Sequence, residues 1–140
     1  ESAIDHYASL ALINYDALRK EIQFSTAGVS PVLYFSSTEK TWKKVSSESE
    51  PLGVEKTTKY ADHTLQLQSG DIIALYTDGL VESVDDNGIQ YSESRLKEVI
   101  GANASRDGKQ IADAVNSDLT GFMGNAAFHD DQSLVVLKIQ

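Results

Sequence analysis

Six strand-like segments lie within residues 7–76 of this 140-residue chain, before any helical pattern begins. Residues 21–26 alternate polar and apolar side chains, the period of two expected of a strand with one exposed face. Residues 7–15 and 72–76 are apolar at almost every position, which predicts strands that are covered on both faces. The remaining strands are expected at 32–35, 42–45 and 64–68, with turns at 16–20 and 69–71. This succession indicates a fold built from antiparallel sheets.

Two helices and a last strand are expected in the second half of the chain. The first helix has Ser92 as its expected N-cap and Gly101 as its stop, and its apolar positions are Leu96, Val99 and Ile100. The second follows a capping-box pair, Asp107 and Gln110, and its apolar stripe is Ile111, Val115, Leu119 and Phe122. Residues 133–139 form the last apolar run. The sequence therefore predicts a single α+β domain of layered, mostly antiparallel sheets with packed helices.

The composition excludes several classes of protein. The chain has no Cys, so it can build neither a disulfide framework nor a thiolate metal site. Its net charge of -9 repels the phosphate backbone, and no nucleic-acid partner is expected. Its apolar runs are far shorter than the roughly 20 residues of a membrane helix. The chain opens at Glu1 without an initiator Met or a secretory signal, which indicates that an upstream part is missing. The absence of Cys predicts a cytoplasmic protein, and attachment of the intact protein to a sensor or membrane domain stays open as an alternative.

Two acidic positions flank the two apolar strands that are expected to be buried. Asp78 follows the strand at 72–76, with only Thr77 between them. Asp130 and Asp131 precede the strand at 133–139. If these strands are antiparallel neighbours, both acidic positions lie at the same edge of the sheet. Mg²⁺ and Mn²⁺ prefer such oxygen ligands. Gly79 is expected to let the backbone turn sharply away and to hold the Asp78 side chain in place.

Each of these acidic positions also has an ordinary structural interpretation. An isolated Asp-Gly pair most often ends a strand in a turn, and an Asp-Asp pair can simply cap a loop. The segment 85–88 resembles the start of a calcium loop, but Ser94 stands where that loop needs a bidentate Glu. We therefore expect a plain β-turn at 85–88. The order of several segments along the chain favours a metal site at the other two positions.

Five segments occur here in one order. They are Ser-Thr-Ala-Gly-Val-Ser-Pro at 25–31, Pro-Leu-Gly-Val at 51–54, Gly-Asp at 70–71, Leu-Tyr-Thr-Asp-Gly-Leu-Val-Glu-Ser at 75–83 and Asp-Asp-Gln-Ser-Leu at 130–134. This succession resembles the stage II sporulation protein E type of the metal-dependent Ser/Thr protein phosphatases. The resemblance extends from about residue 7 to residue 139, and the Thr-Asp-Gly segment paired with the terminal Asp-Asp is its most specific part.

The resemblance implies an α-β-β-α sandwich with a binuclear Mn²⁺ or Mg²⁺ centre at one end of its two sheets. In that family the Asp of Thr-Asp-Gly and the first Asp of the terminal pair are metal ligands, which here means Asp78 and Asp130. Gly79 and Asp131 are expected to support the two ligands. The implied reaction is hydrolysis of phosphoserine or phosphothreonine on a phosphorylated regulatory protein of the anti-anti-sigma type, by water that the cations activate.

The chain departs from the family pattern in two ways. Val29 stands where the family usually has His. The N-terminal half of the family's domain, with further Asp residues that bridge the metals, has no counterpart before residue 7. We therefore expect residues 1–140 to be the C-terminal portion of a single phosphatase domain, inactive alone. The alternative is a catalytically dead protein-interaction domain of the same fold.

Truncation of a sandwich also affects association. A missing half leaves apolar sheet faces and unpaired strand edges without their covers. Such surfaces recruit other chains, and self-association through them, for example by strand exchange, is therefore expected.

Overall fold

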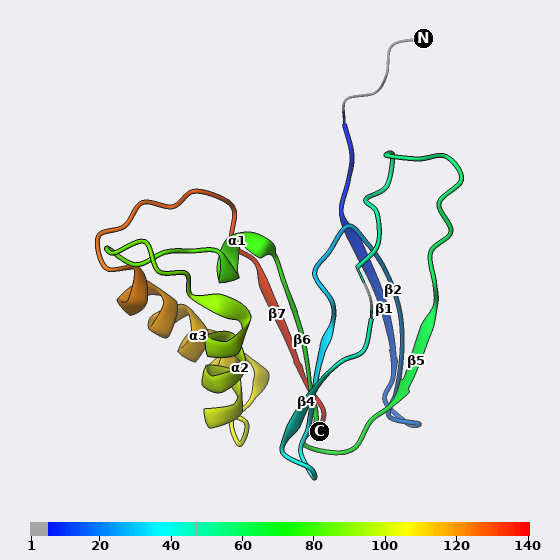
Figure 1. The fold of residues 1–140 in the computed structure, drawn as a ribbon. Helices are drawn as coiled ribbons and strands as arrows, with labels where there is room; N and C mark the ends of the chain where they lie inside the picture. The colour runs from blue at the N-terminus through cyan, green and yellow to red at the C-terminus, as the bar shows by residue number, and fades with distance from the viewer. Residues whose placement is uncertain (1–5, 47) are drawn as a thin grey trace.

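The computed structural model describes residues 6–46 and 48–140 of the chain (Figure 1). The elements follow in the order β1 (Leu10–Asp16), β2 (Glu21–Ala27), β3 (Leu33–Ser36), β4 (Thr41–Lys44), β5 (His63–Gln66), β6 (Ile72–Tyr76), α1 (Asp78–Val81), α2 (Ser92–Ala102), α3 (Gly108–Met123) and β7 (Leu134–Lys138). All strand pairings between these elements are antiparallel. The expected order of strands and helices is confirmed, apart from the short helix α1.

The strands form two sheets that face each other. One sheet has the order β1-β2-β5, and the other has the order β4-β3-β6-β7. Helices α2 and α3 cover the side of the second sheet that faces away from the first (Figure 1). The described residues therefore form three layers, sheet on sheet on helices, and the predicted α+β class is confirmed.

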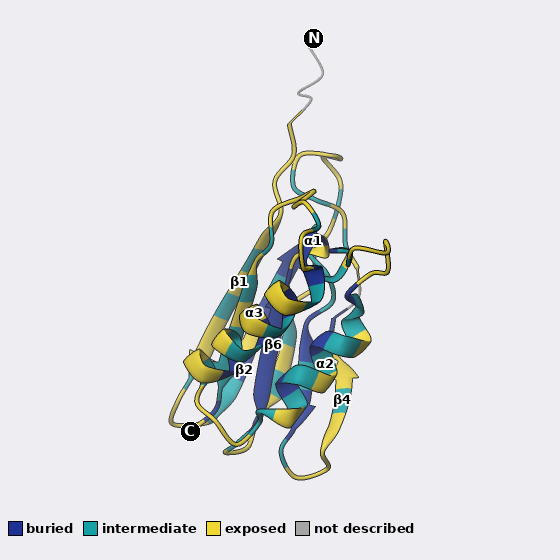
Figure 2. Cartoon of the chain, turned by 90° about the vertical axis from the view of Figure 1, so that its left-hand side faces the viewer, coloured by how far each residue is buried: buried dark blue, intermediate teal, exposed yellow. Residues whose placement is uncertain are grey.

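Strand β6 is buried on both faces because it lies between the two cores (Figure 2). Ile72, Ala74 and Tyr76 pack toward the helices, while Ile73 and Leu75 pack toward the first sheet. Alternate side chains of a strand point to opposite faces, so an apolar residue is needed at every position of this strand. The prediction of a doubly covered strand is correct here.

The same prediction for residues 7–15 is wrong. Strand β1 lies at the edge of the first sheet, where Leu10 is 42% exposed and Leu12 is 61% exposed. Only the opposite face of β1, which includes Ile13, packs against a core. No element among the described residues covers the outer face of this sheet. The apolar run of β1 therefore belongs to a strand that is packed on one face only. Self-association through this face stays a prediction.

The two long helices begin with the expected hydrogen bonds. At α3, Asp107 Oδ1 accepts from Gln110 N at 2.8 Å and Gln110 Oε1 accepts from Asp107 N at 3.4 Å, which confirms the capping box. Helix α2 starts at Ser92, one residue before the expected position, and continues one residue past its expected stop. Ser92 Oγ still accepts from Arg95 N at 3.3 Å. In the part of the chain that the structure describes, no helix has the length and apolarity needed to cross a membrane.

The segment 85–88 is a turn, as predicted. Asp85 Oδ1 accepts hydrogen bonds from the backbone N–H groups of Asn87 and Ile89, each at 2.9 Å. Gly88 has a φ of 79°, which a glycine adopts without strain. The Asp85 carboxylate thus accepts the hydrogen bonds of an ordinary turn.

A buried carboxylate joins the turns at the start of β6. The Asp71 side chain is fully buried and accepts four hydrogen bonds. Its Oδ1 accepts from Ser37 N at 2.8 Å and Ser37 Oγ at 2.9 Å, and its Oδ2 accepts from Gln68 N at 2.8 Å and Tyr34 OH at 3.0 Å. Burial raises the pKa of Asp71, but these hydrogen bonds outweigh burial and hold the pKa below its usual value.

We expect Asp71→Asn to lower the free energy of unfolding by about 3 kcal/mol at pH 7, because an amide group turns one acceptor into a donor that faces other donors. Because the pKa of Asp71 is lower in the folded state, the ionised carboxylate stabilises the fold above pH ~4. This stabilisation is lost as the pH falls through the folded-state pKa. The difference between variant and parent should therefore shrink at acid pH in urea unfolding. Asp85→Asn, in an exposed turn where water replaces lost bonds, is the control with a much smaller effect. Equal effects of both substitutions would contradict this account.

Candidate metal centre

The antiparallel pairing of β6 with β7 brings the two predicted ligand segments together. Tyr76, at the end of β6, pairs with Leu134, at the start of β7, and Thr77 N donates to Ser133 O at 3.1 Å. Asp78 begins α1 just beyond this point, and Asp130 lies on the loop that leads into β7 (Figure 1). The prediction that both acidic positions lie at the same edge of the sheet is confirmed.

Thr77 fastens the loop before β7 to the end of β6. Its hydroxyl donates to the carbonyl of Asp131 at 3.1 Å and accepts from Ser133 N at 2.9 Å. A single side chain therefore fixes two points of the loop that carries Asp130. No sequence pattern predicts this role of Thr77, although its place directly before Asp78 is where such a contact could be sought.

Gly79 has a different role from the one predicted. It lies within helix α1, and so does not provide a sharp turn. A Cβ atom at this position would lie 2.3 Å from the carbonyl oxygen of Asp131 and 3.1 Å from Cβ of Asp130. Gly79 is therefore required for the close approach of α1 to the loop, which makes the backbones of Asp78 and Asp130 neighbours.

A second set of contacts holds α1 against the same loop. Ser83 is buried, and its hydroxyl donates to the carbonyl of Gly79 at 2.7 Å. Gln132 in turn donates from Nε2 to Ser83 Oγ at 2.6 Å. The loop is thus attached to α1 on one side by Gln132 and to the end of β6 on the other by Thr77.

The carboxylates of Asp78 and Asp130 are both exposed to solvent on this scaffold. Asp78 Oδ1 accepts a hydrogen bond from Ser30 Oγ at 2.6 Å. Asp130 Oδ1 accepts from the backbone N–H of Asp131 at 2.7 Å. Asp131 therefore contacts both Asp130 and Thr77 through its backbone, an arrangement that suits a supporting residue.

The donor chemistry of these residues fits part of a Mg²⁺ or Mn²⁺ site. Carboxylate oxygens are the ligands that these hard cations prefer, and Mg²⁺ usually keeps several waters beside one or two carboxylates. Within residues 6–46 and 48–140, no group of three or more His, Cys, Asp or Glu side chains is placed to hold a metal ion. Asp78 and Asp130 can thus supply two ligands, and a binuclear centre needs more.

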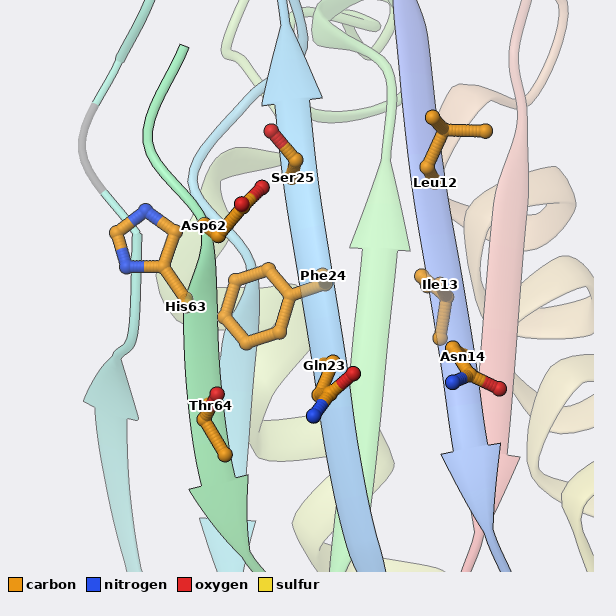
Figure 3. Close-up of a pocket in the computed structure, with 9 residues that line it drawn as sticks. All are labelled: Leu12, Ile13, Asn14, Gln23, Phe24, Ser25, Asp62, His63 and Thr64. Carbon is orange, nitrogen blue, oxygen red and sulfur yellow. The ribbon is translucent and has the colours of Figure 1, made fainter.

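The hollow shown in Figure 3 is a separate feature of the first sheet, with a volume of about 440 Å³. Within this hollow, the imidazole ring of His63 stacks on the ring of Phe24, with the ring centroids 5.0 Å apart. Its lining residues are Leu12, Ile13, Asn14, Gln23, Phe24, Ser25, Asp62, His63 and Thr64. Neither Asp78 nor Asp130 lines it, so this hollow does not belong to the candidate metal centre.

Comparison with known proteins relates the chain to bacterial phosphatases. It is 23% identical over 132 residues to the phosphoserine phosphatase RsbU of Bacillus subtilis, covering 94% of this chain and 39% of RsbU. Its fold matches the SiaA-PP2C domain of Pseudomonas aeruginosa with a TM-score of 0.80 at 16% identity, covering 94% of this chain and 52% of that one. It matches the phosphatase domain of SpoIIE from Bacillus subtilis with a TM-score of 0.70 at 20% identity, covering 95% and 59%.

The chain spans well under half of the RsbU sequence and a little over half of each of these two phosphatase domains. The structural matches show that the two sheets and their helices have the fold of these domains. The family model described as Stage II sporulation protein E (SpoIIE) matches residues 1–140. The chain therefore belongs to the stage II sporulation protein E family.

Proposed function

We propose that the intact protein is a metal-dependent phosphatase that removes phosphate from serine or threonine of a regulatory protein of the anti-anti-sigma type in the cytoplasm. The observation that carries this proposal is the pair of exposed carboxylates, Asp78 and Asp130, on a scaffold fixed by Thr77 and Gly79. Membership of the SpoIIE family supports it. The relative RsbU is named a phosphoserine phosphatase, which favours phosphoserine as the substrate group.

Asp78 and Asp130 would hold Mn²⁺ or Mg²⁺ through their carboxylate oxygens. Such cations, when bound, supply Lewis-acid activation of water and charge neutralisation at the phosphate. Thr77, Gly79 and Asp131 keep the backbones of Asp78 and Asp130 close together, because they attach the loop of Asp130 to α1 and β6. With the backbones fixed, only the two side chains remain to be ordered when a cation binds, which lowers the entropic cost of binding.

The remaining ligands are proposed to lie in a preceding part of the same domain. Residues 1–140 would then form the C-terminal portion of a phosphatase domain. The share of the relatives that the chain covers, 52% of one phosphatase domain and 59% of another, supports this proposal.

The isolated 140-residue chain is expected to hydrolyse no phosphoprotein at a measurable rate, even with excess Mn²⁺. Two like-charged cations about 3.5–4 Å apart repel each other unless further carboxylates bridge them, and the described residues of this chain bring two carboxylates to the site. Adding the preceding part of the domain, in cis or as a separate polypeptide, should restore Mn²⁺-dependent release of phosphate from a phosphoserine protein. Release of phosphate can be measured with a colorimetric assay.

Two results would change the proposal. Rapid turnover by the chain alone would show that its own residues complete the site. Absence of turnover by the full-length protein would favour a binding domain that retains the fold. Val29, which stands where the family usually has His, agrees with that outcome.

A further inference from the structure

A serine from a distant loop contacts the proposed metal ligand Asp78. Ser30 lies between β2 and β3, 48 residues before Asp78, and its Oγ is 2.6 Å from Asp78 Oδ1. This length is typical of a charge-assisted bond from a hydroxyl to a carboxylate. Val29, the neighbour of Ser30, has no side-chain group that donates a hydrogen bond. Ser30 thus supplies the polar contact that this loop makes with Asp78.

The loop that carries Ser30 is itself fixed. Gly28 has a φ of +64°, and a Cβ atom there would lie 2.7–2.8 Å from atoms of Pro51, so the backbone of the loop packs directly on that proline. Gly28 N donates to Ser49 O at 3.0 Å, and Ser9 Oγ donates to Gly28 O at 2.8 Å. Contacts on both sides therefore hold the loop in one place.

The residue after Ser30 restricts it further. Pro31 confines the backbone of the residue before it to extended conformations. The restricted backbone consequently fixes the position of the Ser30 hydroxyl. The Asp78 carboxylate to which it donates is exposed and would otherwise rotate freely.

We propose that Ser30 is a positioning residue that orients the Asp78 carboxylate for binding of the cation, an inference that rests on the proposed function. Asp78 Oδ1 has a second lone pair after accepting from Ser30, and Oδ2 is not used by this bond, so the contact leaves acceptor capacity for a metal. Partners that orient ligating side chains typically contribute 10–100-fold to metal affinity or activity. The structure thus assigns to Ser30 a role in metal affinity, with no contact to the reacting atoms.

The test measures Mn²⁺ affinity of the full-length protein by electron paramagnetic resonance of the free ion. Ser30→Ala should weaken the affinity by about tenfold or more. Ser30→Thr, which keeps the hydroxyl, should stay close to the parent. Ser25→Ala is the matched control, because it removes a hydroxyl whose hydrogen bond goes to the carbonyl of Ala61 and not to Asp78. Phosphatase activity of Ser30→Ala should return to near the parental rate at saturating Mn²⁺, and its unfolding midpoint should be unchanged.

Asp78→Asn separates failure of this inference from failure of the proposed function. If Asp78→Asn binds Mn²⁺ as the parent does, Asp78 is not a ligand and the proposed function loses its main support. If Asp78→Asn loses affinity but Ser30→Ala does not, the role of Ser30 is overturned and the proposed function stands. An equal loss of affinity in Ser30→Thr and Ser30→Ala would also overturn it, because the hydroxyl would then be irrelevant.

Discussion

Asp78→Asn or Asp130→Asn in the full-length protein is expected to lower phosphatase activity by more than about 100-fold. Loss of the residues that merely support metal ligands costs about 10–100-fold, and loss of a ligand should cost more. Each substitution removes a negative charge from the cation site and keeps the volume of the side chain. Initial rates of phosphate release from a phosphoserine protein, measured over a range of Mn²⁺ concentrations, test this expectation.

Folding should survive both substitutions. The two carboxylates are exposed, so no buried charge loses its partner when either is replaced. Asp62→Asn provides a matched control, since Asp62 is an exposed carboxylate in the hollow of the first sheet. It should retain full activity. An Asp78→Asn or Asp130→Asn protein with parental activity would remove that residue from the metal site.

Gly79→Ala should both destabilise the protein and abolish most of its activity. In an ordinary helix this change is favourable by up to ~1 kcal/mol, but here the new methyl group would lie 2.3 Å from the carbonyl oxygen of Asp131. Relief of this overlap must shift α1 or the loop of Asp130, which we expect to cost about 2 kcal/mol of stability. A displacement of one ligand by about 1 Å can reduce the rate roughly 100-fold.

Gly121→Ala is the control for this substitution. Gly121 also lies in a helix, α3, and a Cβ atom there would meet nothing within 4 Å. The variant should be as active as the parent and as stable or slightly more stable. Urea unfolding and initial rates would show whether the two variants differ. Equal behaviour of Gly79→Ala and Gly121→Ala would contradict the close approach of α1 to the loop.

Much of the fold could be predicted because local patterns and tertiary packing agree. Strand β2 alternates because one of its faces meets a core, and the Asp107–Gln110 capping box is a purely local device at the start of α3. The prediction for residues 7–15 fails because apolar composition does not reveal whether a second element covers the strand. Helix α1, with four residues, is too short for any hydrophobic period to show.

The candidate metal centre was partly predictable for similar reasons. Asp78 and Asp130 could be paired because strand ends in an antiparallel sheet follow from the strand order. The need for a glycine at position 79 could not be predicted. It depends on the position of the Asp131 carbonyl, 52 residues further along the chain. Ser30 was equally hidden. Its hydroxyl resembles that of any other loop serine until the fold places it beside Asp78.

The most direct test of the proposed metal centre is a crystal structure of the full-length protein or its intact phosphatase domain soaked in Mn²⁺, with anomalous diffraction recorded at the manganese edge. We predict two anomalous peaks about 3.5–4 Å apart, with oxygens of Asp78 and Asp130 at roughly 2.1 Å from the manganese. Manganese peaks whose ligands include neither carboxylate would contradict the assignment of this sheet edge as the metal centre.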